Sequence, residues 1–336
     1  MQQMTFGQTG LTVGRTGFGC IPIQRISYDE STALLRHAYE NGVTLYDTAN
    51  GYTTSEERIG IALSHVRENI VLCTKSAPNK PEAFMANIEN SLKKMQTDYI
   101  DVFQVHNPSF VPRPGGEDGI YDTLLKAKEQ GKIRHIGITN HKLQLAEEAV
   151  KSGLYETVQF PLSYLSRDNE LNLIALCKVH NVGVLAMKGL CGGLLTNAKA
   201  AFAFLRQYEN VVPIWGIQKM EEMNEFLECE ANPPALDSNM LAAIEKDKAE
   251  LAGNFCRGCG YCLPCPVGIP INTAARITFL LRRSVSEKFT TDEWKENMRN
   301  IDKCVKCGKC TAACPYGIDA PELLALQQKE YFEMVK

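Results

Sequence analysis

The chain has 336 residues, which is long enough for two domains and a large buried core. Its formal net charge of −3 argues against a nucleic acid or another polyanion as its partner. No apolar run approaches the roughly 18 residues of a membrane-spanning helix, and the first residues lack the charged and apolar regions of a signal peptide. We therefore expect a cytoplasmic protein that has neither a nucleic acid nor a membrane as its partner.

Between residue 16 and about residue 230, short β-rich runs alternate with amphipathic helical stretches. The predicted strands are Thr16–Ile21, Thr44–Ala49, Ile70–Ser76, Tyr99–His106, Arg134–Asn140, Thr157–Leu162, Gly183–Lys188 and Val211–Gly216. The predicted helices between them include Glu30–Glu40, Glu56–His65, Pro81–Met95, Asp122–Gln130, Gln144–Lys151 and Asn169–His180. Such a succession predicts a (β/α)8 barrel of the TIM type. A doubly wound open sheet is the alternative, but no Gly-x-Gly-x-x-Gly follows the first strand.

Turn residues and prolines divide the rest of the chain. Thr5–Gly14 carries turn glycines and is expected to form a hairpin at the bottom of the barrel. Asn232-Pro233-Pro234 indicates a boundary, so we predict a barrel domain over residues 1–235 and a second domain over residues 236–336. The second domain is expected to be small, loop-rich and of mixed α+β type. Helices are predicted at Asp237–Leu251 and at Ile271–Ser284.

Eight of the thirteen cysteines lie in the last quarter of the chain, in two runs that each end in Cys-Pro. The runs are Cys256, Cys259, Cys262 and Cys265, and Cys304, Cys307, Cys310 and Cys314. The second run has the spacing of bacterial ferredoxins, in which three cysteines hold one [4Fe–4S] cluster and the fourth holds the other. This pattern predicts two clusters, with Cys314 completing the first set and Cys265 the second. The first run departs from the pattern, because two residues rather than three precede Cys265.

Zinc is the alternative ligand of these runs. Four cysteines spaced by two residues do not easily surround one tetrahedral ion, so the spacing favours iron–sulfur clusters. The five other cysteines are expected to be buried, because they lie among apolar neighbours: Cys20, Cys73, Cys177, Cys191 and Cys229.

Four polar residues stand at or just after the carboxyl ends of predicted strands, where barrels of this type carry their active sites: Asp47, Tyr52, Lys75 and His106. Taken singly, each has an ordinary structural interpretation, such as a helix cap, a loop aromatic, an ion pair or a hydrogen-bonded histidine. In this order and spacing they resemble the catalytic tetrad of the aldo-keto reductase family. The resemblance spans residues 4 to about 230 and includes the segment from Gly131 to Asn140, and the cysteine region resembles the ferredoxin extension of some bacterial members.

The resemblance implies an enzyme that reduces a small-molecule carbonyl, or oxidises an alcohol, with NADH or NADPH. Tyr52 would be the general acid and base, and Lys75 would favour its phenolate and lower its pKa. Asp47 would hold Lys75 in place, and His106 would orient the carbonyl oxygen.

The resemblance also implies contacts to the nicotinamide cofactor. Thr139, Asn140 and Gln159 would hold the carboxamide, and Met187 would pack on the nicotinamide ring. Gly216, Ile217 and Gln218 would contact the pyrophosphate and adenosine. Glu222 would repel the 2′-phosphate of NADP, whereas Lys219 nearby would attract it, so the choice between NAD and NADP stays open.

Two further hypotheses concern electron flow and substrate. Nicotinamide exchanges two electrons as hydride, whereas each cluster passes one, and a flavin is the usual intermediary although no flavin motif is present. The barrel is alternatively a redox-sensing or electron-transfer module that binds nucleotide and serves a flavoprotein or ferredoxin partner without carbonyl turnover. Arg113 is a candidate for binding an anionic substrate group, with a solvated surface arginine as the alternative.

Overall fold

The computed structural model describes residues 1–251, 255–283 and 287–335. The chain forms two compact units, and each is described by itself. The first unit comprises Met1–Gly189 and Ala201–Ala235, and the second comprises Leu190–Ala200 and Leu236–Lys336. The second unit therefore includes a short segment from within the predicted barrel domain, and the division at residue 235 as a boundary between independently folding domains stays a prediction.

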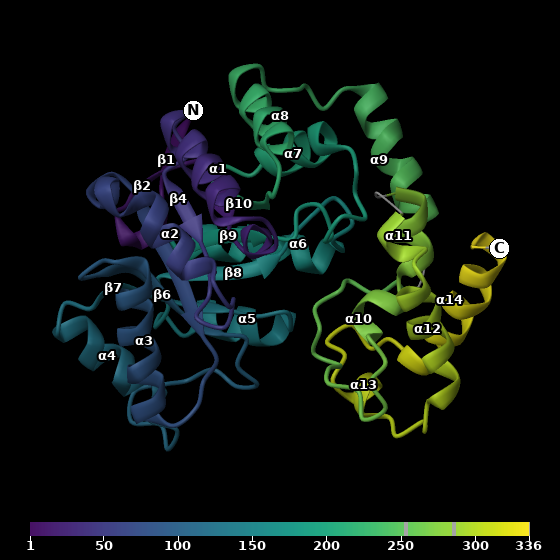
Figure 1. The fold of residues 1–336 in the computed structure, drawn as a ribbon. Coiled ribbons are helices and arrows are strands. Elements are labelled where there is room, and N and C mark those ends of the chain that lie inside the picture. Colours follow the sequence, from purple (N-terminus) through teal and green to yellow (C-terminus); the bar gives the residue numbers. More distant parts are fainter. Residues whose placement is uncertain (252–254, 284–286, 336) are drawn as a thin grey trace. The chain divides into compact units, whose positions relative to one another are not determined.

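Eight parallel strands form a closed barrel in the first unit (Figure 1), which confirms the predicted fold. They are β3 (Gly17–Gly19), β4 (Leu45–Asp47), β5 (Val71–Ser76), β6 (Ile100–His106), β7 (Ile133–Thr139), β8 (Thr157–Pro161), β9 (Gly183–Met187) and β10 (Val211–Gly216). Neighbouring strands follow the chain order, and β10 closes the barrel by pairing with β3, with Trp215 opposite Phe18. The carboxyl ends of all eight strands consequently meet at one end of the barrel.

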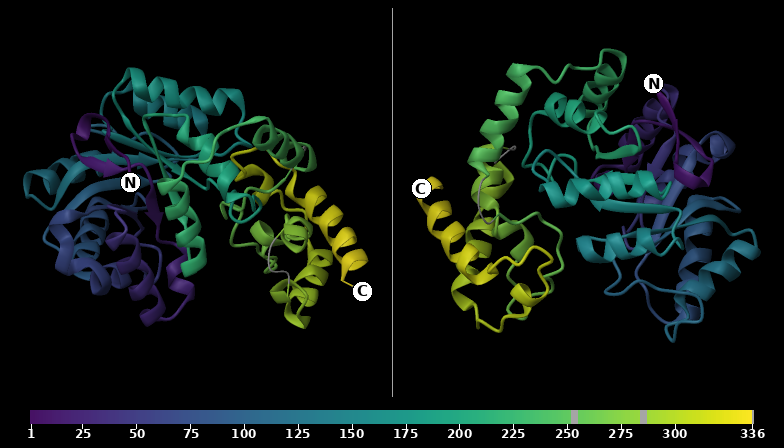
Figure 2. Two further views of the ribbon diagram at one scale, coloured as in Figure 1. Left: turned by 90° about the horizontal axis from the view of Figure 1, so that it is seen from above. Right: turned by 180° about the vertical axis from the view of Figure 1, so that it is seen from behind.

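A helix follows each of these strands and lies outside the barrel (Figures 1 and 2). The helices are α1 (Tyr28–Glu40), α2 (Ser55–Leu63), α3 (Pro81–Met95), α4 (Ile120–Glu129), α5 (Leu143–Lys151), α6 (Asp168–Val179), α7 (Ala198–Arg206) and α8 (Met220–Ala231). The start of α1 shows how local sequence fixes a helix. The Ser27 hydroxyl accepts the Glu30 N–H, and the Glu30 carboxylate accepts the Ser27 N–H, which satisfies two donors of the first turn.

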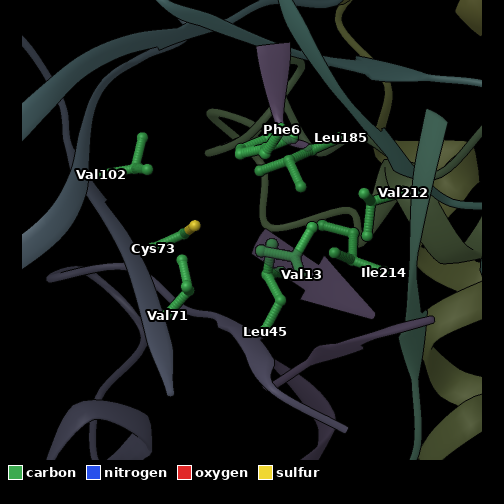
Figure 3. Close-up of a cluster of buried hydrophobic side chains, with 9 residues drawn as sticks. All are labelled: Phe6, Val13, Leu45, Val71, Cys73, Val102, Leu185, Val212 and Ile214. Atoms are coloured by element: carbon green, nitrogen blue, oxygen red, sulfur yellow. The ribbon is translucent and has the colours of Figure 1, made fainter. Parts of the chain in front are cut away.

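An antiparallel hairpin of β1 (Gln3–Thr5) and β2 (Thr12–Gly14) closes the amino-terminal end of the barrel, as predicted. Phe6 and Val13 from this hairpin are fully buried among apolar side chains from the strands (Figure 3). The strand residues of this cluster are Leu45, Val71, Cys73, Val102, Leu185, Val212 and Ile214. Because this end is filled by apolar side chains, polar chemistry is confined to the opposite end.

The regular elements of the second unit are all helices among the described residues, so its loop-rich character is confirmed and the expected strand content is not. The α-helices are α9 (Ser238–Glu250), α10 (Ile271–Ala274), α11 (Ile277–Arg283), α12 (Asp292–Arg299), α13 (Lys309–Ala312) and α14 (Ala320–Met334), and two short 3-10 helices span Glu287–Phe289 and Asn300–Lys303. Helix α14 contacts each of α10 to α13 and thus organises the unit (Figure 1).

The helix predicted at Ile271–Ser284 is interrupted. Two helices, α10 and α11, occupy this range with Ala275 and Arg276 between them, and the predicted end at Ser284 lies outside the described residues. Among the described residues, no helix combines the length and apolar composition needed to cross a bilayer.

Candidate functional site

The four residues of the predicted tetrad lie together at the carboxyl end of the barrel. Asp47 ends β4, Lys75 lies one residue before the end of β5, His106 ends β6, and Tyr52 lies in the turn between β4 and α2. Lys75 Nζ donates to Asp47 Oδ2 over 2.6 Å and lies 5.4 Å from the centre of the Tyr52 ring. The Tyr52 and His106 rings meet edge to face with their centroids 6.1 Å apart.

Hydrogen bonds fix the buried ion pair of Lys75 and Asp47 from several sides. Lys75 Nζ also donates to the carbonyl of Thr48 over 2.7 Å. The Asp47 carboxylate accepts the side-chain amides of Gln104 at 3.1 Å and Gln159 at 3.2 Å. Sequence reasoning missed Gln104, although its position two residues before His106 on the same strand places both side chains on one face.

Burial and neighbouring charges shift the pKa values of Lys75, Asp47 and Tyr52 in opposite directions. Burial alone would lower the pKa of Lys75, but the Asp47 carboxylate and Tyr52 raise it above its usual value, so the ammonium is retained. Burial raises the pKa of Asp47, against the effect of Lys75 and the two amides. Burial also raises the pKa of Tyr52, and this outweighs the lowering by Lys75. The lowering by Lys75 is as predicted, whereas the net shift is upward.

His106 is held as a neutral imidazole. Burial, assisted by the positive charge of Lys75, lowers its pKa to about 3. A neutral imidazole carries one N–H donor, which is the form suited to a hydrogen bond with a carbonyl oxygen.

The three residues predicted to hold the carboxamide differ in what their side chains contact. Asn140 donates to the carbonyl of Pro108 and accepts the Lys142 N–H, and Thr139 Oγ1 accepts the Asn107 N–H, so both hold the loop after β6. Gln159 is different, because its buried Oε1 has no hydrogen-bond partner among the described residues. A buried, open acceptor fits the amide N–H donors of a nicotinamide carboxamide.

Met187 and the residues after β10 lie at the same end of the barrel. Met187 ends β9 and is partly buried, and it packs against the apolar cluster inside the barrel that includes Leu185. Gly216 ends β10, and Ile217 and Gln218 follow it, with Ile217 almost fully buried.

Glu222 caps the amino-terminal end of α8. Its carboxylate accepts the backbone N–H groups of Gln218 at 2.9 Å and Lys219 at 3.2 Å, at the start of α8. Glu222 is therefore a helix cap, and the argument that it selects against NADP loses its force.

The eight cysteines of the two runs line two neighbouring cavities within the second unit. The first cavity is bordered by Cys256, Cys259, Cys262, Cys310 and Cys314, and the second by Cys262, Cys265, Cys304, Cys307 and Cys310. The space between the lining atoms is about 400 Å³ in the first and about 410 Å³ in the second, solvent at the mouths included. Thiols in an otherwise largely apolar wall are the donor set of an iron–sulfur cluster. In the described ranges, no three His, Cys, Asp or Glu side chains surround a single-ion position.

Positive groups lie close to the first cavity. Burial raises the pKa of Cys256, while the Gly258 N–H, 3.3 Å from its sulfur, and the Arg276 guanidinium lower it. Arg276 also donates to the carbonyl of Cys191 over 3.0 Å, within the segment Leu190–Ala200 of the same unit.

The remaining sequence candidates have structural roles. Arg113 forms an exposed ion pair with Glu148, with Nη2 and Oε1 2.9 Å apart, so the interpretation as a surface arginine is favoured. The five cysteines outside the two runs are all buried, as predicted.

Comparison with known proteins agrees with both parts of this description. The aldo/keto reductase family profile matches residues 4–202, and the profile of the 4Fe-4S dicluster domain matches residues 255–319. Among curated relatives, the aldo-keto reductase YhdN of Bacillus subtilis is 31% identical over 216 residues, or 58% of this chain and 64% of the relative. L-galactose dehydrogenase of Arabidopsis thaliana is 31% identical over 213 residues, or 56% of this chain and 66% of the relative. The chain thus spans slightly less than two thirds of each.

Solved structures share the barrel. An aldo-keto reductase from Klebsiella pneumoniae in complex with NADPH superposes with a TM-score of 0.63 at 24% identity, covering 73% of this chain and 95% of that one. Aldo-keto reductase AKR11C1 from Bacillus halodurans, in its holo form, gives 0.63 at 21% identity, with 74% and 96% covered. At these identities the likeness establishes the fold.

Proposed function

Because the chain belongs to the aldo/keto reductase family, an oxidoreductase family, we propose that it reduces the carbonyl group of a small molecule by hydride transfer from NADPH. The reverse reaction would oxidise the corresponding alcohol. The convergence of Asp47, Lys75, Tyr52 and His106 at one end of the barrel supports this proposal most strongly. NADPH is proposed as the donor because a structural neighbour binds it and because Glu222, as a helix cap, gives no reason to exclude it.

In this proposal each tetrad residue has one task. A bound NADPH would supply the hydride, and the Tyr52 hydroxyl would give its proton to the carbonyl oxygen. The Lys75 ammonium stabilises the phenolate that this transfer leaves behind, and Asp47 keeps Lys75 charged and in place. Neutral His106 donates its N–H to the carbonyl oxygen and orients the substrate.

The cofactor would be held by residues around the same end. Gln159 Oε1 would accept an N–H of the carboxamide, and Met187 would pack on the nicotinamide ring. Thr139 and Asn140 would border the carboxamide and keep the loop after β6 in position. Gly216, Ile217 and Gln218 would border the pyrophosphate and adenosine.

The second unit would hold two [4Fe–4S] clusters, which supply one-electron transfer when bound. The linings of the two cavities support one set of Cys256, Cys259, Cys262 and Cys314, and another of Cys265, Cys304, Cys307 and Cys310. These cavities also favour a second candidate function, in which the barrel binds nucleotide and the protein exchanges single electrons with a redox partner.

A labelling experiment tests the first proposal directly. NADPH that carries deuterium at C4 is incubated with the holoprotein and a panel of aldehydes, and the alcohols are analysed by mass spectrometry. Deuterium on the carbinol carbon is the expected result. Nucleotide binding with no labelled alcohol from any aldehyde would favour the electron-transfer module instead.

A further inference from the structure

One edge of the second unit is basic and exposed. Lys303, Lys306 and Lys309 each precede a cysteine of the second run, so a lysine recurs at every third position. All three lysines are exposed, and of the eight cysteines in the two runs only Cys307 is exposed. We call residues 303–309 the lysine edge.

The charges of the lysine edge are available to an outside partner. Within the described parts of the chain none of its lysines forms an ion pair, and the one carboxylate between residues 300 and 316, Asp302, accepts an N–H from Gln328. Lys306 and Lys309 border the second cysteine cavity, and no Asp or Glu does. The edge therefore presents a net positive charge beside the second set of cysteines.

The first cysteine run has no such edge. Arg257 is its one charged residue, and its guanidinium lies 4.4 Å from the centre of the Tyr316 ring. Its cysteines are all partly buried. The two runs thus share a ligand pattern and differ in charge and exposure.

An exposed apolar side chain completes the surface. Val305 lies between two of the lysines, is 64% exposed and borders the second cavity. An apolar centre with a charged rim is the usual composition of a transient protein interface.

We propose that the lysine edge is the docking surface for an acidic one-electron carrier protein. The proposal rests on the assignment, made above, of Cys265, Cys304, Cys307 and Cys310 to one cluster. In each encounter one electron passes between the reduced carrier and this cluster. The carrier is oxidised by one electron as the cluster is reduced by one, and no bond forms and no proton moves. Charge attraction favours and orients the encounter, and the exposure of Cys307 brings the carrier close to the cluster.

The test measures the binding of the holoprotein to a small acidic ferredoxin by calorimetry, with a basic cytochrome c as the comparison probe. The wild type is expected to bind the ferredoxin, more weakly as salt rises from about 0.05 M to about 0.5 M because exposed charges are screened over this range. The triple variant Lys303→Gln, Lys306→Gln, Lys309→Gln should bind about tenfold more weakly, the scale of three exposed charge pairs.

The matched control is Lys246→Gln, Lys248→Gln, Lys329→Gln, which removes three exposed charges elsewhere in the same unit and should bind like the wild type.

Iron, sulfide and EPR measurements on each variant establish that the clusters are present. If the triple variant loses iron, the Lys→Arg triple, which keeps the charges, and the salt dependence of the wild type decide instead. Binding that is independent of salt, equal loss in the control, preference for the basic probe, or an altered cluster potential with unaltered affinity would each overturn the proposal. Aldehyde turnover with NADPH is recorded in parallel, so that failure of docking is distinguished from failure of the reductase assignment.

Discussion

The barrel site and the cysteine region are organised on opposite principles. In the barrel, the charged groups are fixed by partners within the protein, as Asp47 is by Lys75, Gln104 and Gln159. In the second unit, the thiols border cavities, and hydrogen bonds to them are few among the described residues. The comparison indicates that the barrel site is preorganised by its own polar network, whereas the geometry of the second unit depends on what the thiols hold.

The largest expected effect concerns the barrel. Tyr52→Phe removes the proposed proton donor and leaves the ion pair intact, so hydride transfer should fall by at least about 100-fold. Binding of NADPH, followed by fluorescence titration, should change little. Tyr208→Phe, which also removes a single phenol hydroxyl, is the control and should turn over normally. A Tyr52→Phe enzyme with the wild-type rate would contradict the assignment.

The second prediction concerns the dependence of the second unit on its ligands. Cys314→Ser replaces one proposed ligand of the first cluster, so the iron content of the anaerobically purified protein should fall by about half. Cys177→Ser, at a buried cysteine of the barrel, should leave the iron content unchanged. Iron and sulfide analysis measures both, and an unchanged content in Cys314→Ser would exclude the proposed exchange of ligands.

The third prediction uses the lowered pKa of His106. Between about pH 3 and the usual value near 6.5, the unfolded chain binds a proton that the folded chain does not. This contribution to stability is therefore complete above about pH 6.5 and is lost as pH falls, by up to about 1.4 kcal/mol per pH unit.

NMR of the labelled imidazoles measures the effect, and the His106 signal should not titrate above pH 5. A His106→Asn variant should lose stability less steeply with acid than the wild type. A midpoint near pH 6.5 would show that the ring is not held neutral by burial.

The smallest effect concerns the cap of α8. Glu222→Ala removes the acceptor for two N–H groups and should lower the free energy of unfolding by about 1 kcal/mol. If Glu222 is a cap and not a determinant of cofactor choice, the ratio of NADPH to NADH activity should stay nearly constant. A ratio that rises more than about tenfold would restore the electrostatic interpretation.

Local patterns were sufficient for much of the fold. All eight strands lie within or next to their predicted ranges, because alternation of short apolar runs with helical stretches is a local signal. The four residues of the predicted tetrad lie together, because three of them stand at or next to strand ends that the topology brings to one end of the barrel, and Tyr52 lies in the turn after β4. Their catalytic roles stay a prediction.

What sequence reasoning missed depends on contacts between distant residues. The hydrogen bond from Gln104 to Asp47 joins residues 57 positions apart. The break between α10 and α11 places Arg276 beside Cys191, 85 positions away. The raised pKa of Tyr52 follows from burial, which cannot be read from the charged residues that the sequence places near it.

The segment Leu190–Ala200 has a consequence for anyone who wishes to cut or exchange the parts of this protein. It joins β9 to α7 but groups with the second unit, where the Cys191 carbonyl accepts an N–H of the Arg276 guanidinium. Gly192 and Gly258 both have positive φ, and a Cβ on either would approach the Arg276 guanidinium to 3.0 or 2.7 Å. A chain shortened to residues 1–235 would lose Arg276, the partner of this segment. A ferredoxin module grafted from another protein would need a comparable arginine to replace the contacts that Arg276 makes with Cys191, Gly192 and Gly258. A cut at residue 235 would therefore not separate the two units, because residues 190–200 belong with the second one.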